Sequence, residues 1–238
     1  MILFTGGSGL LGKEMQELYP QGLFPTHKEF DVADFDKMFH HIYDNNLIVD
    51  TIVHAAAYTN TTQCETIRTS KVECITTNII GTANIVKICM AFNIRLIYIS
   101  TDYVYAGNKK YSKETDAVNP INNYAFSKLG GECSVHFLAD FVIVRTSFCK
   151  NEYPYDRAFD DQYTSRIPVN KFAKKLERII DNKHIQGIIN VGGKRKTVYE
   201  LAKKISPEKE IIPIKRNDIQ NYKLPKDTSL NTERFKRL

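Results

Sequence analysis

The chain has 238 residues, of which 42% are hydrophobic and 25% charged, and its formal net charge at pH 7 is +6. This length suits one large domain or a domain with a small appended lobe, and the composition allows a sizeable core without disulfides or a structural metal. The five cysteines form no CxxC pair and no Cys/His spacing typical of zinc. We therefore expect reduced thiols, a cytoplasmic protein and no metal site.

The positive charge is concentrated near the carboxyl terminus. Residues 194–238 contain 13 lysines and arginines against 6 acidic residues, a balance of +7, so residues 1–193 are near −1. A basic lobe suits an anionic ligand such as a diphosphate, although a solvated lysine-rich surface has the same composition. No nucleic-acid-binding motif is present, and neither a signal peptide nor an apolar run of about 18 residues is seen. We expect no nucleic-acid or membrane partner.

Short apolar runs alternate with longer helical patterns as far as residue 147. Continuously apolar runs predict strands, which is typical of a parallel sheet covered by helices on both faces. The predicted strands are 2–5, 23–26, 49–56, 95–100 and 141–147, and the predicted helices are 11–18, 35–46, 71–93 and 123–138. The alternation predicts an α/β fold with a Rossmann-type, doubly wound parallel sheet.

The pattern loosens after residue 147. Residues 148–166 are polar and loop-like, and they are followed by a helix (169–182), a strand (187–193), a helix (197–206) and a strand (210–214). We predict a first domain over 1–147 and a small C-terminal lobe over 148–238. One strand of this lobe could return to the main sheet.

A glycine-rich turn joins the first predicted strand to the first predicted helix. The sequence TGGSGLLG places Gly6, Gly9 and Gly12 around Leu10 and Leu11. Such a turn lets the backbone approach a pyrophosphate at the helix amino terminus, and Gly12 allows the helix to pack closely on the strand. A tight structural turn is the alternative. In this strand–turn–helix context we predict a dinucleotide-binding site.

The residues after the second predicted strand bear on which dinucleotide is bound. His27 or Lys28 stands where an acidic residue would favour NAD, and a base there tolerates the 2′-phosphate of NADP. A solvated loop charge is an equally good interpretation. We expect NADP(H) to be preferred and NAD(H) to be usable, with Asp31 and Val32 beside the adenine.

The segment NNYAFSKLGGE (122–132) places Tyr124 and Lys128 four residues apart, on one face of a predicted helix. A cation beside a phenol stabilises the phenolate, so such a pair can pass protons near neutral pH. The spacing alone is weak evidence, because three other tyrosines also have a lysine four residues later: Tyr105, Tyr199 and Tyr222.

Taken together, these features resemble the extended short-chain dehydrogenase/reductase superfamily and, within it, the dTDP-4-dehydrorhamnose reductase family. The similarity covers nearly the whole chain, and STDYVY followed by YxxxKLxGE is far more specific than YxxxK alone. The matching stretches are TGGSGLLG, FDVAD, VHAAAYT (53–59), ISTDYVYAG (99–107), NPINNYAFSKLGGE (119–132), VRTS (144–147), INVGGKRKTVYELA and DTSLNT.

The resemblance implies reduction of a sugar ketone with a nicotinamide cofactor. Tyr124 would donate a proton to the carbonyl oxygen, and Thr101 would polarise that oxygen. Lys128 would lower the pKa of Tyr124 and hold the nicotinamide ribose. Of the four tyrosines, only Tyr124 follows a strand ending in Ser-Thr and begins a helix beside the expected nicotinamide position.

The resemblance also implies the remaining ligand contacts. Besides the glycine turn, the cofactor would be lined by Ala55, Ala56, Ala57, Asn78 and Ser100. The substrate would be contacted by Tyr58, Thr59, Asp102, Tyr103, Phe148 and Arg166. The sequence departs from the family pattern in two places: the segment 148–166 is short for the family, and Phe148 stands where the family has tryptophan. These departures leave the identity of the sugar and of the nucleotide (dTDP, UDP or GDP) open.

We therefore expect an NADP(H)-dependent reductase of a 4-keto-6-deoxy sugar nucleotide, serving polysaccharide biosynthesis as a monomer or homodimer. Residues 1–147 would bind the cofactor and residues 148–238 the substrate. One alternative is a nucleotide-sugar epimerase or epimerase/reductase, with Cys149 and His136 as the candidate acid/base couple. The other is a non-catalytic dinucleotide-binding regulatory subunit, because the regulatory subunit of methionine adenosyltransferase resembles the same family.

Overall fold

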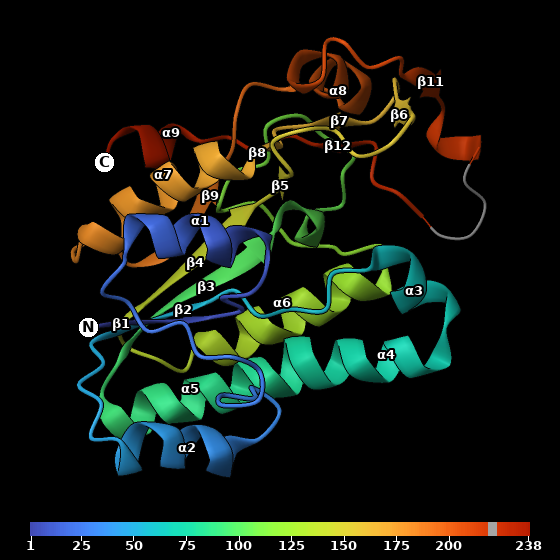
Figure 1. Ribbon diagram of the computed structural model, residues 1–238. Coiled ribbons are helices and arrows are strands. Elements are labelled where there is room, and N and C mark those ends of the chain that lie inside the picture. Colours follow the sequence, from blue (N-terminus) through green and yellow to red (C-terminus); the bar gives the residue numbers. More distant parts are fainter. Residues whose placement is uncertain (219–222) are drawn as a thin grey trace.

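A five-stranded parallel sheet forms the centre of the computed structural model, which describes residues 1–218 and 223–238 (Figure 1). The strand order is β1-β2-β3-β4-β9, and every neighbouring pair is parallel. The strands are β1 (Ile2–Thr5), β2 (Thr51–His54), β3 (Arg95–Thr101), β4 (Phe141–Thr146) and β9 (Gly187–Val191). The α/β fold predicted from the apolar runs is confirmed, and a strand from the C-terminal part joins the main sheet.

The strand predicted over residues 23–26 was wrong. Only Leu23 pairs with the sheet: it forms a single parallel bridge to Leu3, with hydrogen bonds from Phe4 N and to Ile2 O. Pro25 follows two residues later, and proline has no N–H with which to extend the ladder. The sheet therefore has one bridging residue where the prediction placed a strand.

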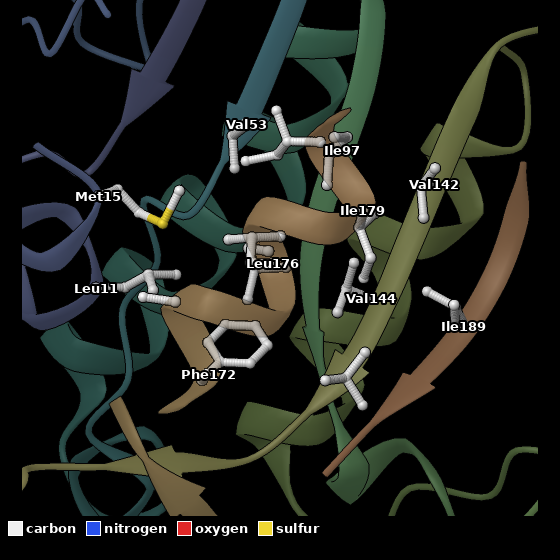
Figure 2. Close-up of a cluster of buried hydrophobic side chains, with 14 of the residues drawn as sticks. Leu11, Met15, Val53, Ile97, Val142, Val144, Phe172, Leu176, Ile179 and Ile189 are labelled. Atoms are coloured by element: carbon white, nitrogen blue, oxygen red, sulfur yellow. The ribbon is translucent and has the colours of Figure 1, made fainter. Parts of the chain in front are cut away.

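Helices α1 (Leu10–Leu18) and α7 (Val169–Asp181) cover one face of the sheet, with the short α9 (Glu233–Lys236) beside them (Figure 1). Their apolar side chains meet the alternate strand residues that point to this face (Figure 2). Those drawn from the helices include Leu11, Met15, Phe172, Leu176 and Ile179, and those from the strands include Val53, Ile97, Val142, Val144 and Ile189.

The opposite face is covered by α2 (Phe35–Asp44), α5 (Gly81–Phe92) and α6 (Asn123–Val135). The register partners Leu3, Ile52 and Leu96 point to this side, whereas the next residue of each strand points to the α1/α7 side. Because successive side chains of a strand alternate between faces, a continuously apolar strand is buried on both.

One helical stretch differs from its prediction in two ways. It runs from Arg68 to Phe92 as α4 (Arg68–Ile75), a π-helical turn (Thr76–Ile80) and α5, after the short α3 (Thr61–Thr66). By length and composition it could cross a membrane, contrary to the expectation from the apolar runs, and 39% of its most apolar window is buried. Because α5 packs on the sheet, the stretch also fits the core helix of a globular protein.

The remainder of the C-terminal part forms small sheets above the carboxyl ends of the main strands (Figure 1). Segments expected to be loops contribute very short strands that pair with distant ones. The pairs are β5 (Phe148–Cys149) with β8 (Ile167–Pro168), β6 (Arg157–Phe159) with β11 (Ile212–Ile214), and β7 (Tyr163–Thr164) with β10 (Lys196–Thr197) and β12 (Asp227–Thr228). Helix α8 (Val198–Ile205) packs against β6.

Candidate active site

A cavity of about 940 Å³ lies where the main strands end, between the glycine turn, the loops that follow the strands and α6. Ligands of open α/β sheets bind at this carboxyl edge. Most residues predicted to bind ligands line it: Gly6, Gly9, Leu10, Leu11, His27, Asp31, Val32, Ala55, Ala56, Ala57, Tyr58, Thr59, Ser100, Thr101, Asp102, Tyr103, Tyr124, Lys128, Phe148 and Arg166. Gly12, Lys28 and Asn78 do not line it.

The glycine turn has the geometry of a backbone cradle. Gly6 adopts φ +76°, and a Cβ atom there would lie 2.9 Å from Ala56 N. A Cβ atom on Gly12 would lie 2.2 Å from Gly7 O, so Gly12 serves the packing of α1 rather than the cavity surface. Gly9 caps α1 without a side-chain hydrogen bond, which leaves backbone N–H groups of the first turn directed at the cavity.

Behind the loop that follows β2, a buried polar cluster fixes the backbone. His54 is fully buried and contacts Thr5 Oγ1 at 2.8 Å and Thr82 Oγ1 at 3.1 Å. Burial, with a smaller effect from Lys128, lowers the pKa of His54 to about 3, so its ring is neutral. Thr5 Oγ1 in turn accepts hydrogen bonds from Ala55 N and Ala56 N. His54 therefore positions the cavity wall and does not face a ligand.

Asn78 lies behind the cavity wall instead of on its surface, in the π-helical turn. Its side chain accepts a hydrogen bond from Tyr58 N at 2.8 Å and donates to Tyr58 O and to Ser127 Oγ. Ser127 Oγ donates to Tyr124 O. Asn78 thus joins the loop after β2 to the first turn of α6. The π-helical turn aims it inward, and the sequence carried no signal of that turn.

Thr101, Tyr124 and Lys128 all line the cavity, and Tyr124 makes a side-chain hydrogen bond with Thr101. Thr101 ends β3 and accepts a hydrogen bond from Tyr103 N at 3.2 Å. Tyr124 lies in the first turn of α6, whose cap Asn122 accepts from Ala125 N at 2.9 Å. Lys128 is 2% exposed, and its Nζ lies 4.2 Å from the centroid of the Tyr98 ring.

The electrostatics of this triad differ from the expectation. Burial, together with the negative charge of Asp102, raises the pKa of Tyr124 well above its usual value, and a hydrogen bond with Thr101 opposes this. Burial lowers the pKa of Lys128 to about 7, against the opposing effects of Glu132 and Cys74. Because Lys128 is only partly charged near pH 7, it does not make Tyr124 a phenolate. Tyr124 is a neutral phenol, which is the form that donates a proton.

Asp102 and Arg166 form the side of the cavity near the C-terminal lobe. Asp102 is 1% exposed, and burial raises its pKa to about 6 against the opposing effects of Thr228 and Arg166. Within residues 1–218 and 223–238, Asp102 Oδ2 has no hydrogen-bond partner. Arg166 Nε donates to Ser147 Oγ at 2.9 Å. Phe148 stacks on Phe172 with 5.0 Å between the ring centroids, which fixes it at the cavity wall.

The opposite end of the cavity is built by residues near the predicted adenine position. His27 Nε2 lies 3.5 Å from Asp31 Oδ2, and Asp31 Oδ1 accepts from Ala33 N. Of the two predicted bases, His27 lines the cavity and Lys28 does not.

Thirteen further lining residues were missed by the sequence reasoning. Most adjoin predicted residues and could have been added by proximity, but those from α4 and the π-helical turn carried no sequence signal. They are Gly7, Ser8, Pro25, Phe30, Ala33, Thr61, Val72, Glu73, Thr76, Thr77, Ile99, Thr146 and Ser147.

Three other sequence candidates lie elsewhere or cannot be described. Cys149 and His136, the candidate epimerase couple, do not line the cavity. Tyr222 lies outside the described residues. Within residues 1–218 and 223–238, no group of three His, Cys, Asp or Glu side chains is arranged to hold a metal ion.

Two known proteins have sequences that align with most or all of this chain. The chain is 30% identical to the dTDP-4-dehydrorhamnose reductase of Aggregatibacter actinomycetemcomitans over 202 residues, which is 81% of this chain but 62% of that protein. It is 25% identical to the methionine adenosyltransferase 2 subunit beta of Bos taurus over 278 aligned positions, covering 100% of this chain and 82% of that protein.

Two solved structures that are named as dTDP-4-dehydrorhamnose reductases superpose on the structure of this protein. A hypothetical dTDP-4-dehydrorhamnose reductase from Sulfolobus tokodaii is 28% identical, with a TM-score of 0.86 and coverage of 100% and 94% of the two chains. The Bacillus anthracis dTDP-4-dehydrorhamnose reductase in complex with NADP is 25% identical, with a TM-score of 0.86 and coverage of 99% and 90%. The sequence model of the RmlD substrate binding domain family matches residues 1–238, and the chain belongs to this family.

Proposed function

We propose that the protein is an NADP(H)-dependent reductase of a 4-keto-6-deoxy sugar nucleotide, with NAD(H) as a usable second cofactor, in nucleotide-sugar and polysaccharide biosynthesis. The observation that carries the proposal is the meeting of Thr101, Tyr124 and Lys128 in one cavity beside the glycine turn. The reductases that match the chain support it.

The residues present fit a dinucleotide. The cradle at Gly6 has no room for a Cβ atom, and the amino terminus of α1 offers unpaired N–H groups to a pyrophosphate. The cofactor would lie along Gly9, Leu10 and Leu11, with the adenine near Asp31 and Val32. Ala55, Ala56, Ala57 and Ser100 would line it further along, and Lys128 would hold the nicotinamide ribose. When bound, a reduced nicotinamide supplies the hydride.

The chain's own residues supply alignment and the proton. Thr101 Oγ1 would hydrogen-bond the ketone oxygen and polarise the carbonyl. Tyr124, which is protonated because of its burial and the nearby Asp102, would donate its phenolic proton to that oxygen as negative charge develops. Lys128 in its ammonium form would stabilise the phenolate left on Tyr124, so the proton transfer and the lysine's charge are coupled.

Residues 1–147 would form the cofactor-binding domain and residues 148–238 the substrate-binding lobe, but substrate contacts would come from both. Tyr58, Thr59, Asp102 and Tyr103 would face the sugar from loops that follow the main strands. Phe148 and Arg166 would face it from the C-terminal lobe, where Arg166 is a cation suited to a diphosphate. A cytoplasmic monomer or homodimer without nucleic-acid or membrane partners stays our prediction.

The test is NADPH oxidation with dTDP- and UDP-4-keto-6-deoxy sugars. Replacing Tyr124 by Phe removes the proton donor and should lower kcat by about 10²–10⁴-fold with NADPH binding retained. Tyr199→Phe is the matched control, because Tyr199 also has a lysine four residues on but packs in the C-terminal lobe. Equal loss in both variants would refute the role of Tyr124.

A regulatory subunit is the second candidate, favoured by the match to a methionine adenosyltransferase subunit beta along the whole chain. It predicts tight NADPH binding without turnover of any sugar ketone. Under that proposal, Tyr124→Phe would change neither binding nor any partner's activity. The couple that the sequence suggested for the epimerase alternative, Cys149 and His136, does not line the cavity.

A further inference from the structure

Glu132 is a buried carboxylate that the proposed reaction does not use directly. It lies in α6, two turns after Tyr124 and one turn after Lys128, and is 1% exposed. A buried carboxylate requires charged or hydrogen-bonding partners, because its ionised form is otherwise too costly away from water.

Its partners come from two strands of the main sheet. Arg145 of β4 donates from Nη2 to Glu132 Oε2 at 2.7 Å and from Nε to Oε1 at 3.1 Å. Ser100 of β3, which immediately precedes Thr101, donates from Oγ to Glu132 Oε1. Arg145 also donates from Nη1 to Tyr105 OH at 2.9 Å, which fixes the guanidinium. Glu132 therefore ties α6 to the ends of two strands at the floor of the cavity.

Apart from Glu132, few anionic groups act on the Lys128 ammonium. The groups that interact with its ammonium are the Tyr98 ring of β3, His54 of β2, Cys74 of α4 and, in α6 itself, Glu132. His54 is neutral, and the Tyr98 ring, 4.2 Å from Lys128 Nζ, carries no charge either. Residues four apart on a helix are neighbours, so the Glu132 carboxylate is the fixed negative charge nearest in the chain to the lysine.

We propose that Glu132 is a positioning residue that keeps Lys128 in its ammonium form while it holds α6 in register with the end of β3. The same carboxylate interacts with two cations: it accepts hydrogen bonds from Arg145, and it stabilises the Lys128 ammonium by electrostatic attraction. The consequence for catalysis rests on the proposed reductase function, whereas the effect on the charge of Lys128 does not.

The physical balance at Lys128 makes the effect measurable. Burial lowers the pKa of Lys128 to about 7, and the Glu132 carboxylate opposes that effect. Without the carboxylate, burial would act with less opposition, and the Arg145 charge would be left without its counter-ion. Lys128 would then be a neutral amine at pH 7 and could not stabilise a Tyr124 phenolate.

The experiment follows the titration of Lys128 directly, by the ¹³Cε resonance of labelled lysine, assigned through its absence in Lys128→Arg. In Glu132→Gln, Lys128 should titrate at least about one pH unit below the wild type, equivalent to a tenfold lower ratio of ammonium to amine. Glu132→Asp keeps the charge and should titrate near the wild type. With a reducible sugar ketone, the high-pH limb of kcat should move to lower pH in Glu132→Gln and be restored in Glu132→Asp.

Two results would overturn the proposal. One is a Lys128 titration midpoint in Glu132→Gln that equals the wild-type midpoint. The other is an equal shift of that midpoint in Glu132→Gln and Glu132→Asp, which would indicate a structural role alone. If Glu132→Gln does not fold, the double variant Glu132→Gln/Arg145→Gln removes both charges. Lys128 should then still titrate below the wild type, but by less than in Glu132→Gln, because the repulsion from an unpaired Arg145 is absent. If no sugar ketone is reduced by any variant, the proposed function fails, while the titration still decides the role of Glu132.

Discussion

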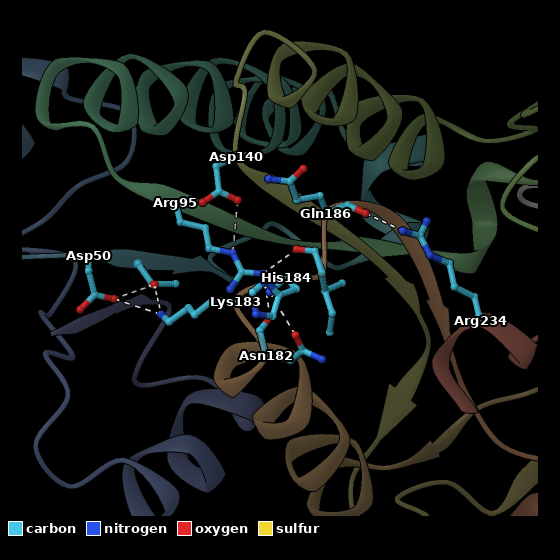
Figure 3. A network of polar contacts seen from close by, with 10 residues as sticks. Asp50, Arg95, Asp140, Asn182, Lys183, His184, Gln186 and Arg234 are labelled. Atoms are coloured by element: carbon cyan, nitrogen blue, oxygen red, sulfur yellow. Dashed lines mark hydrogen bonds and ion pairs between the residues drawn. The ribbon is translucent and has the colours of Figure 1, made fainter. Parts of the chain in front are cut away.

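Charged side chains at the amino ends of the main strands and those that line the cavity at the carboxyl ends are compensated to different degrees. At the amino ends of the strands, Arg95 Nη2 donates to Ile185 O at 2.7 Å and to Asn182 O at 3.2 Å (Figure 3). Asp50 is held by Lys183 Nζ at 3.3 Å and by the chain's amino terminus. At the carboxyl ends, Asp102 Oδ2 has no hydrogen-bond partner among the described residues, and Lys128 Nζ lies 4.2 Å from the centroid of the Tyr98 ring.

The pKa values follow this difference. Although burial raises the pKa of Asp50, hydrogen bonds from the amino terminus, Thr51 and Lys183 lower it to about 2. Burial instead drives Asp102 up to about 6 and Lys128 down to about 7, because little compensates it there. Arg95 and Asp50 hold the loops of the amino edge together, although Arg95 Nε and Nη1 have no hydrogen-bond partner among the described residues. The incompletely compensated charges of Asp102 and Lys128 cost stability and are available to a ligand. Perturbed pKa values of this kind cluster at functional sites.

Lys128→Met gives the largest contrast between the edges. We expect kcat to fall by about 10²–10⁴-fold, because the charge that stabilises the Tyr124 phenolate is removed. We also expect the free energy of unfolding to rise by several kcal/mol, on the order expected for a buried lysine. Sugar-ketone-dependent NADPH oxidation and urea unfolding at pH 7 measure the two effects.

The stability gain should depend on pH with a definite sign. The pKa of Lys128 is about 7 when folded and 10.5 when unfolded, so the unfolded wild type binds more protons between these values. Wild-type stability therefore rises with pH across that window, and the advantage of Lys128→Met should shrink between pH 7 and pH 10. A constant difference would mean that Lys128 is not titrating as described.

Arg95→Met should show the reverse pattern at the amino edge. It removes two hydrogen bonds to backbone carbonyl groups and the 3.5 Å contact with Asp140, so we expect a loss of about 2–4 kcal/mol in unfolding free energy. At a temperature where the variant is folded, kcat and KM should stay within about twofold of the wild type. A large change in KM alone would show that the two edges are coupled.

Asp102→Asn tests the carboxyl edge with a smaller change. The pKa of Asp102 is about 6 when folded and 3.8 when unfolded, so its contribution to stability is present below pH 3.8 and lost as the pH rises through 6. The Asn variant should be more stable than the wild type by on the order of 2–3 kcal/mol at pH 7.5, but not at pH 3.5. If Asp102 contacts the sugar, KM should rise about tenfold, read from initial rates at pH 7.5.

His27→Ala should produce the smallest effect, confined to the choice of cofactor. His27 lines the cavity and the neighbouring Lys28 does not. We expect the ratio of kcat/KM for NADPH to that for NADH to fall by about threefold to tenfold in His27→Ala, because a hydrogen bond to the 2′-phosphate is lost. Lys28→Ala is the matched control, and a larger effect there would reverse the assignment.

Local pattern alone determined much of the fold. The continuously apolar runs predicted all five strands of the main sheet within a few residues, because a strand buried on both faces has no polar side. The glycine spacing predicted the turn before α1, because only glycine fits where a Cβ atom would meet Ala56 N. The same reasoning failed at residues 23–26, where strand-like composition does not outweigh a proline that cannot extend the ladder.

The tertiary structure decided what spacing could not. Four tyrosines have a lysine four residues on, but packing buries Tyr105 against Arg145 and Asn190 and places Tyr199 in the C-terminal lobe. It brings Tyr124 to the cavity and turns Asn78 behind its wall. It also sets the pKa values of Lys128 and Asp102, because desolvation depends on which distant segments cover a side chain, and neighbours along the chain do not record that.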